Sequence, residues 1–436
     1  EIFHEGIRIP PVKLYERGNL RRDVLDMICL NTRCPDIVSA DILSMVGATR
    51  MGGRRMAEIC AELGAEGYAA HCDAILDYAE RIVRRGIEAI PDGVYHGEDS
   101  MAGEGRDAPP AQIAVTVTIK GSDVRVDFAG SSPQLRNYKN SSLANTYSAV
   151  YVAISTMLGA DIPHNEGSYR MVSVDAPEGS VVNPRSPAPV TFSTVHPTYE
   201  IIHAIWRAFE TVCPQRVSAG WGKLCHPVTS GRRTGSNELF VLYHMAAQPG
   251  AGAYAGRDGF DQVGQLQSLG AITIPNLEIY EQLYPIEFVK HEFRVDSGGA
   301  GRYRGGTGVE YAVRMLTATQ NNLRGEGLGA PTGFGVHGGS AGAAGEIRAV
   351  DDAGADIEMP DCGVATLPPC VLTVTSSGGG GWGDPRTRPE ADVARDVADG
   401  VVSVSAARDL YRVVIEPDTL AIDVEATRRH RGGAPG

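Results

Sequence analysis

A histidine–glutamate–histidine set between residues 196 and 203 has the residue types and spacing best suited to chemistry. His196, Glu200 and His203 are four and three residues apart, so they share one face if the segment is helical. Imidazole and carboxylate ligands suit Zn, Mn or Fe, and the set is therefore a candidate metal site. We favour the simpler interpretation, a helix with a polar face. His226 and His244 stand alone in apolar segments, where a histidine is usually a hydrogen-bonded core residue.

Motifs for nucleotide binding or nucleophilic catalysis find little support. The sequence contains no GxxxxGK[ST] motif. Residues 333–338 match GxGxxG in letters only, because Pro331 and Thr332 stand where a strand should precede and glycines follow in place of a helix. No Gly-x-Ser-x-Gly elbow sits on a strand–turn–helix, so a Ser/His/Asp triad cannot be argued. The eight cysteines lack CxxC spacing, and we expect reduced thiols without a catalytic role.

Composition and charge set limits on the kind of protein. The 436 residues are 42% hydrophobic and 21% charged, as in soluble globular proteins, and allow about three domains. The net charge of −13 argues against a nucleic-acid partner, which needs a basic face. No apolar run approaches the ~20 residues that span a bilayer. With no signal peptide at the start of the sequence, we expect a cytoplasmic protein without a membrane partner.

Hydrophobic periodicity predicts the elements that must position these residues. Helical spacing dominates residues 21–90, and alternation over residues 113–128 predicts a hairpin that turns near Gly121. Further helices are expected at residues 142–158, 197–212, 389–399 and 404–411, and strands within residues 286–320 and 345–375.

The order of these elements predicts an α+β fold, since helices come first and no regular βαβ alternation follows. We expect a mainly helical region over residues 1–105, a mixed α/β core over 106–320 with antiparallel hairpins, and a glycine-rich strand region over 321–436 closed by short helices.

Two glycine-rich blocks and the N-terminus identify a family resemblance. Residues 378–385 read GGGGWGDP, residues 296–306 read DSGGAGRYRGG, and residues 1–14 read EIFHEGIRIPPVKL. Together these blocks run almost from end to end, and they resemble the hydantoinase B/oxoprolinase family. We expect the run at 378–383 to be a tight turn that brings backbone against backbone, with Trp382 as its anchor.

The resemblance implies a small-molecule enzyme that works with a partner. Family members pair with a hydantoinase A-type ATPase subunit, so ATP is expected on that subunit and not on this chain. In the hydrolase branch, phosphorylation activates a cyclic amide that is then opened. In the carboxylase branch, a phosphorylated ketone is carboxylated. We favour the hydrolase; the alternatives are the ketone carboxylase and a structural half of such a complex without catalytic residues.

The resemblance also implies a divalent metal, Zn, Mn or Fe. The family's metal ligands, an HxxD element among them, belong to a portion that would precede Glu1 of this sequence. We therefore expect a fragment, a processed product or a split subunit that shares the metal with that portion. Glu1 and His4 are the nearest candidate ligands, Glu5 a candidate catalytic base, and Arg8 a candidate substrate-binding residue.

Four further residues complete the candidate site that the resemblance implies. His196 stands where relatives carry an Asn-x-Glu-Thr pattern near the cleft, and Asp258 lies in a loop that matches the family; both are candidate catalytic residues. Arg302 and Arg304 could hold a substrate carboxylate or phosphate. An Asx turn at Asp258 and structural pairing of the two arginines are the alternatives.

Overall fold

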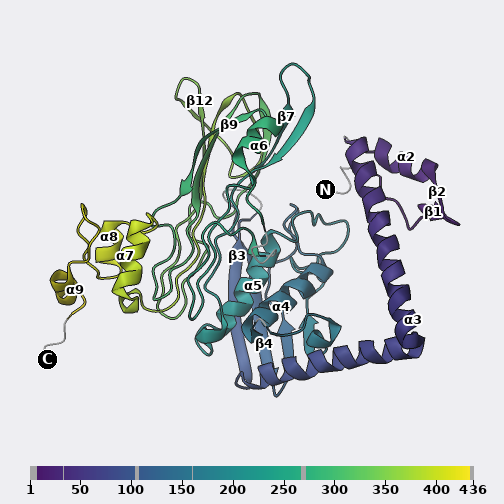
Figure 1. Cartoon of the computed structure of the whole chain (residues 1–436), viewed down its shortest axis with the longest axis horizontal. Coiled ribbons are helices and arrows are strands. Elements are labelled where there is room, and N and C mark those ends of the chain that lie inside the picture. Colours follow the sequence, from purple (N-terminus) through teal and green to yellow (C-terminus); the bar gives the residue numbers. More distant parts are fainter. Residues whose placement is uncertain (1–6, 33, 104–107, 160, 267–271, 433–436) are drawn as a thin grey trace.

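The computed structural model describes residues 7–32, 34–103, 108–159, 161–266 and 272–432. Figure 1 shows an N-terminal helical arm, a central sheet with helices packed on it, a β-sandwich, and a group of short helices at the C-terminal end. Extended chains without regular strand pairing join the last three parts. The predicted α+β class is confirmed.

The N-terminal arm follows from the helical spacing of residues 21–90. Its longest helix bends sharply at Gly64, where φ is 72° and ψ is 160°, a conformation that glycine adopts at little cost. Before the bend the helix projects away from the body, and after it the helix packs under the central sheet (Figure 1). The elements are β1 (Tyr15–Glu16), β2 (Asn19–Leu20), α2 (Arg22–Leu30) and α3 (Pro35–Glu88).

The central sheet has the strand order β3-β4-β5-β6, and its last pair is parallel. The predicted hairpin is confirmed as β4 and β5, which turn at Gly121 with a φ of 60°. Alternate residues of β4 are buried against the helices, which explains the period of two in the sequence. The elements are β3 (Gly93–Met101), β4 (Ala111–Lys120), β5 (Asp123–Asp127), α4 (Leu143–Leu158), η1 (Glu166–Tyr169), β6 (Val172–Asp175), α5 (His196–Phe209) and η2 (Pro214–Arg216).

Two antiparallel sheets form the β-sandwich and share one apolar core. Their orders are β14-β11-β7-β8 and β13-β12-β15-β10-β9. The elements are β7 (Val228–Arg232), β8 (Leu239–Tyr243), α6 (Leu277–Leu283), β9 (Ile286–Phe293), β10 (Val309–Met315), β11 (Thr319–Arg324), β12 (Glu346–Asp351), β13 (Asp356–Ile357), β14 (Cys362–Leu367) and β15 (Cys370–Thr375).

Short helices at the C-terminal end enclose a third, small core. They confirm the helices expected near residues 389–399 and 404–411. The elements are η4 (Pro385–Thr387), α7 (Glu390–Ala398), α8 (Val404–Asp409) and α9 (Val424–His430).

The expected domain boundaries fall within the observed sheets. The boundary expected between residues 105 and 106 falls between the paired strands β3 and β4, and the boundary expected after residue 320 falls inside β11.

Five extended segments lie side by side between the central sheet and the sandwich, and we call them the glycine bundle: residues 219–222, 249–253, 298–308, 333–343 and 376–383. In the run 376–383, backbone amides three residues apart donate to carbonyl groups of the same neighbouring segment. Gly378 and Gly381 donate to the segment 333–343, at Ala343 and Ser340, and Gly379 and Trp382 donate to the segment 298–308, at Gly306 and Tyr303. Three residues per turn is the repeat of a polyproline II-type helix, here with its amide groups bonded to neighbouring chains.

The tight turn expected at residues 378–383 is therefore wrong, although backbone does lie against backbone. A Cβ on Gly379 would lie 1.9 Å from the Ala251 carbonyl oxygen, and one on Gly378 would lie 1.8 Å from that of Ser297. Neither glycine has a backbone conformation in the left-handed region. Glycine is therefore needed at these positions because the neighbouring chains pack so closely, and not because the chain turns there. Trp382 anchors the run as expected, because its indole Nε1 donates to the Pro214 carbonyl at 2.9 Å.

Candidate active site

Close packing of α5 on β3 creates the site. A Cβ on Gly97 of β3 would lie 2.0 Å from the Ala204 carbonyl oxygen of α5, so glycine at this position lets the helix touch the strand backbone. This approach places His203 Nδ1 3.1 Å from Asp99 Oδ2. Nearly every residue of α5 is buried, and the polar residues of the helix therefore face the protein interior instead of solvent.

Lys223 connects the carboxylates of β3 and α5. Its Nζ lies 2.6 Å from Glu200 Oε1 and 3.4 Å from Asp99 Oδ2. The same ammonium donates to the Ser100 carbonyl at 2.7 Å. Lys223 and Glu200 are almost completely buried, and a buried ion pair holds together only when both partners are present.

His203 is held as a neutral ring with its proton on Nδ1. Its Nε2 accepts the Trp221 amide at 3.1 Å, so Nδ1 must be the nitrogen that donates to Asp99. Burial lowers the pKa of His203, and the neighbouring Asp99 only partly opposes this effect. Burial disfavours the Asp99 carboxylate as well, yet Lys223 and His203 hold the pKa of Asp99 below its usual value.

Glu200 is the group in this cluster that can hold a proton at neutral pH. Burial raises its pKa to about 8, against the opposing effect of Lys223. Burial disfavours the Lys223 ammonium, but Asp99, Glu200 and Glu326 together raise the pKa of that lysine. A carboxyl group with a pKa near the working pH is the usual property of a general acid or base.

A second buried pair, Lys139 and Glu326, lies behind residues that line a cavity. Lys139 Nζ is 2.7 Å from Glu326 Oε1, and the same oxygen accepts the Ala102 amide at 2.9 Å. Ala102 is the strand end that faces the cavity. We define the charge cluster as these two pairs with Asp99 and His203.

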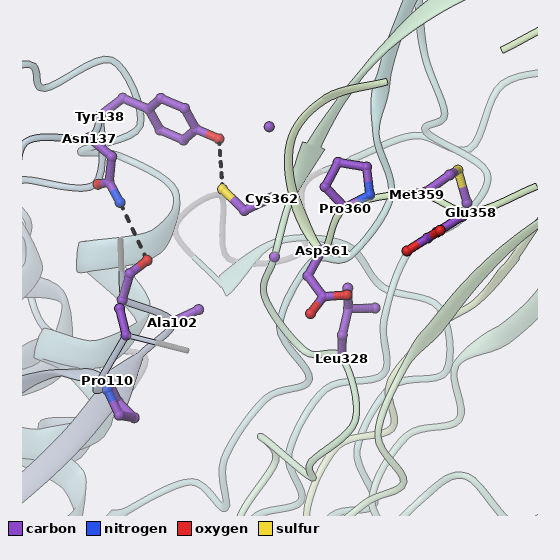
Figure 2. Close-up of a pocket in the computed structure, with 14 residues that line it drawn as sticks. Ala102, Pro110, Asn137, Tyr138, Leu328, Glu358, Met359, Pro360, Asp361 and Cys362 are labelled. Atoms are coloured by element: carbon purple, nitrogen blue, oxygen red, sulfur yellow. Dashed lines mark hydrogen bonds between the residues drawn. The ribbon is translucent and has the colours of Figure 1, made fainter. Parts of the chain in front are cut away.

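The cavity has a volume of about 880 Å³ and lies between the end of β3 and the sandwich. Figure 2 shows Tyr138 and Cys362 joined on one side of it, at 3.3 Å between Oη and Sγ, with Glu358, Met359 and Pro360 on another. Its lining residues are Ala102, Gly103, Ala108, Pro110, Asn137, Tyr138, Gly325, Leu328, Glu358, Met359, Pro360, Asp361, Cys362 and Gly363. A cavity of this size accommodates a small ring compound.

Arg324 contributes an uncompensated positive charge beside the cavity. It ends β11, next to Gly325 of the cavity wall, and is 2% exposed. Within the described part of the chain it makes no ion pair, and its Nε has no hydrogen-bond partner. Its guanidinium lies 5.1 Å from the centre of the Phe192 ring, and the Tyr138 ring packs against the same ring with the centres 4.7 Å apart and the planes tilted by 46°. Such a cation suits an anionic ligand group.

His196 lies on the far side of Phe192, with ring centres 5.8 Å apart. It is fully buried, and neither ring nitrogen has a partner among the residues described. Burial and the positive charges of Lys139, Arg324 and Lys223 lower its pKa well below the usual value. Three cations around a neutral imidazole do not fit a divalent metal at this histidine.

Metal ligation finds no other support in the part of the chain that the structure covers. No group of three or more His, Cys, Asp or Glu side chains there could hold a metal ion. His196, Glu200 and His203 come from one helix as expected, but the expected polar face is interior, and His203 bonds to Asp99 and Trp221. His244 is satisfied as predicted, by Thr229 and Tyr311. No helix in the described ranges could cross a bilayer.

The other expected site residues that the structure describes do not join this cluster. Glu1, His4 and Glu5 lie outside the described residues, and Arg8 is exposed in the N-terminal segment. Asp258 binds Arg388 through both carboxylate oxygens at 2.7 Å.

The two expected substrate-binding arginines differ in their surroundings. Arg304 is 2.8 Å from Asp261 and 3.5 Å from Asp396. Arg302 is exposed, and its guanidinium donates to the Thr387 carbonyl at 3.4 Å. Together with Asp258 and Arg388 they tie the glycine bundle to the C-terminal helices.

Sequence reasoning missed Asp99, Lys139, Lys223, Arg324 and Glu326. A signal existed for Lys223, which stands between Trp221 and an apolar stretch that begins at Leu224. A lysine in such a stretch is rarely buried without a partner. No comparable signal marked the others, because their pairing joins strands and loops far apart in the chain.

Comparisons with known proteins agree with the fold. A sequence model of the hydantoinase B/oxoprolinase family matches residues 1–385. The beta chain of the caprolactamase of Pseudomonas jessenii is 32% identical over 99% of this chain and 75% of its own length. The B component of a putative D-/L-hydantoinase of Pseudomonas sp. (strain NS671) is 30% identical over 99% of this chain and 74% of its own.

Solved structures extend the comparison. The ATP-dependent caprolactamase from Pseudomonas jessenii superimposes with a TM-score of 0.86 at 31% identity, over 99% of this chain and 76% of that one. Nucleotide-free acetone carboxylase superimposes with a TM-score of 0.85 at 21% identity, over 99% of this chain and 64% of that one. The second likeness shows a shared fold.

Proposed function

The chain belongs to the hydantoinase B/oxoprolinase family, and from this premise we propose that it is the subunit of an ATP-dependent cyclic-amide hydrolase on which the amide ring opens. One observation carries the proposal. The buried charge cluster, with a carboxyl group whose pKa is about 8, lies behind the wall of a cavity large enough for a lactam or hydantoin.

Opening an amide ring requires proton transfer and stabilisation of negative charge. Water must lose a proton as it attacks the carbonyl carbon, and the departing nitrogen must gain one. In this proposal Glu200, which is protonated at neutral pH, gives its proton to the departing nitrogen and, as a carboxylate, regains one from water. The Lys139 ammonium, buried behind the cavity wall, favours negative charge that develops around the carbon under attack, since such interactions are strong away from water.

Activation of the substrate by ATP gives a role to Arg324, whose positive charge lies beside the cavity. We propose that a hydantoinase A-type ATPase subunit transfers the γ-phosphoryl group of ATP to the amide oxygen, releasing ADP, and that Arg324 binds this phosphoryl group. Water then adds to the activated carbon, the C–N bond breaks, and the phosphoryl group leaves as inorganic phosphate. Support comes from the buried guanidinium beside the cavity, which makes no ion pair among the described residues. A divalent metal, if the complex carries one, needs ligands beyond the described residues, and no step above depends on it.

A product assay separates the hydrolase from the ketone carboxylase. The chain, copurified with its ATPase partner, is supplied with ATP and either a lactam or hydantoin, or a ketone with labelled bicarbonate. We expect ring-opened amino acid, formed without bicarbonate, and no label in any acid. Label in a ketone-derived acid, with no ring opening, would overturn the hydrolase assignment.

A further inference from the structure

Arg324 is a buried cation that no carboxylate in the described part of the chain neutralises. Its Nε has no hydrogen-bond partner there. Burial lowers the pKa of Arg324, and the groups that oppose this effect are tyrosines and a cysteine, which are uncharged at pH 7. The other buried lysine and arginine side chains in the described ranges each form an ion pair with a carboxylate, and they are Lys139, Lys223, Arg304 and Arg388. A different kind of contact must therefore hold the Arg324 guanidinium.

The ring of Phe192 supplies that contact. The guanidinium carbon of Arg324 lies over the ring, 5.1 Å from its centre, which is within the roughly 6 Å reach of a cation–π interaction. Such an interaction is strongest away from water. Unlike an ion pair, it leaves the positive charge of the arginine uncancelled, so the guanidinium can bind an anion without first losing a carboxylate partner.

The backbone of Phe192 is fixed between the cavity wall and the start of α5. Its amide donates to the Tyr138 carbonyl at 3.2 Å, and its carbonyl accepts the amides of Val195 and His196 at 2.9 and 3.2 Å. The ring of Tyr138, which lines the cavity, packs against the Phe192 ring. These contacts hold the Phe192 ring in one place and, through it, the guanidinium beside the cavity.

We propose that Phe192 is a positioning residue for phosphoryl binding: its ring holds Arg324 by a cation–π contact, and the uncancelled guanidinium binds the phosphoryl group of the activated substrate. This inference rests on the role proposed above for Arg324, since Phe192 acts through that side chain. Loss of the aromatic face should therefore weaken anion binding and leave the fold intact.

Calorimetric titration of the full chain with inorganic phosphate, without the ATPase partner or nucleotide, tests this role. Phe192→Leu keeps an apolar side chain but removes the aromatic face, and the phosphate dissociation constant should rise about tenfold. Phe192→Tyr restores the face and should stay within about threefold of wild type. Phe288→Leu is the matched control: Phe288 is also half-buried but packs on Tyr311 in the sandwich, and phosphate affinity should not change. Thermal melting checks that all three variants are folded.

A double-variant cycle shows whether Phe192 acts through Arg324. Arg324→Met alone should raise the phosphate dissociation constant at least about tenfold. The double variant, Phe192→Leu with Arg324→Met, should bind phosphate no more weakly than Arg324→Met alone. Additive losses in the double variant would overturn the inference, as would phosphate binding that Arg324→Met leaves unchanged.

Ring opening by the assembled complex separates this inference from the proposed reaction. Phosphate binding that depends on Phe192, in a complex that opens no lactam or hydantoin, would support the positioning role and contradict the reaction. Ring opening by a complex in which wild type and Phe192→Leu bind phosphate equally well would overturn the positioning role and leave the reaction standing.

Discussion

The glycine bundle and the charge cluster adjoin each other but are built in opposite ways. In the bundle, backbone amides bond to neighbouring backbones, and no side chain separates the chains. In the cluster, side chains supply every strong contact, and most are charged and buried. The two meet at Lys223, whose carbonyl accepts the Ser377 hydroxyl at 2.8 Å. The bundle therefore fixes the backbone of a residue whose side chain holds the cluster.

Buried polar groups have two roles in this protein: backbone groups in the bundle give rigidity, and charged side chains in the cluster provide groups that can take part in a reaction. In the bundle, many amide donors are satisfied by carbonyl groups of neighbouring backbones, which do not titrate, and this pairing provides rigidity. The cluster retains a protonated carboxyl group, and Arg324 nearby makes no ion pair among the described residues; both features cost stability and are typical of functional sites. We therefore expect substitutions in the bundle to affect folding and substitutions in the cluster to affect turnover.

The largest effect is expected at Gly379. Gly379→Ala would place a Cβ 1.9 Å from the Ala251 carbonyl oxygen, and the bundle would have to separate. We expect insoluble protein or a loss above about 4 kcal/mol in the free energy of unfolding. Gly47→Ala is the control, in open space on α3, and should stabilise by about 0.5–1 kcal/mol. Equal, small effects at both sites in urea unfolding would contradict close chain packing.

Lys223→Met is expected to come next. It leaves Glu200 and Asp99 buried without their cation, and breaking a buried pair costs about 3–5 kcal/mol. A double variant, Lys223→Met with Glu200→Leu, should recover part of that loss because the buried carboxyl group of Glu200 is no longer left without its Lys223 partner. Urea unfolding of wild type, the single variant and the double variant measures the free energy of unfolding of each. If the double variant is no more stable than Lys223→Met, Lys223 and Glu200 are not energetically coupled.

The two expected substrate-binding arginines give a smaller, paired contrast. Arg304 pairs with Asp261 and Asp396, whereas Arg302 is exposed. We expect Arg304→Met to lower the free energy of unfolding by about 2–4 kcal/mol and Arg302→Met to change it by less than about 0.5 kcal/mol. The substrate KM should be the same in both variants. A raised KM in Arg302→Met alone would restore the substrate-binding role.

The smallest expected effect is a pH dependence from Glu200. Its pKa is raised from 4.5 to about 8 in the folded protein, so the folded state binds more protons than the unfolded chain between those values. Stability should therefore fall as pH rises from 5 to 8. Relative to Glu200→Gln, which cannot titrate, wild type should lose on the order of 1–3 kcal/mol across that range. Parallel curves for both proteins would contradict the raised pKa.

The sequence predicted local structure better than it predicted the site. The hairpin at Gly121 followed from the periodicity that one buried face imposes, and the helix near residues 197–212 followed from Pro197, which suits a first helical turn. The glycine bundle did not, because its partners are distant in sequence and its residues carry no side-chain pattern. His203 was correctly placed on a helix, but the approach of that helix to Asp99 depends on Gly97 of β3, a contact that no local pattern encodes.

Turnover of Glu200→Gln in the assembled complex tests most directly whether the charge cluster is the reaction centre. Glutamine keeps the shape of the protonated carboxyl group but cannot transfer its proton. We predict an ATP-dependent ring-opening kcat at least about 100-fold below wild type, with the melting temperature at pH 7 no lower than that of wild type. Ring opening within about threefold of wild type would contradict a role for Glu200 in proton transfer and move the chemistry away from this cluster.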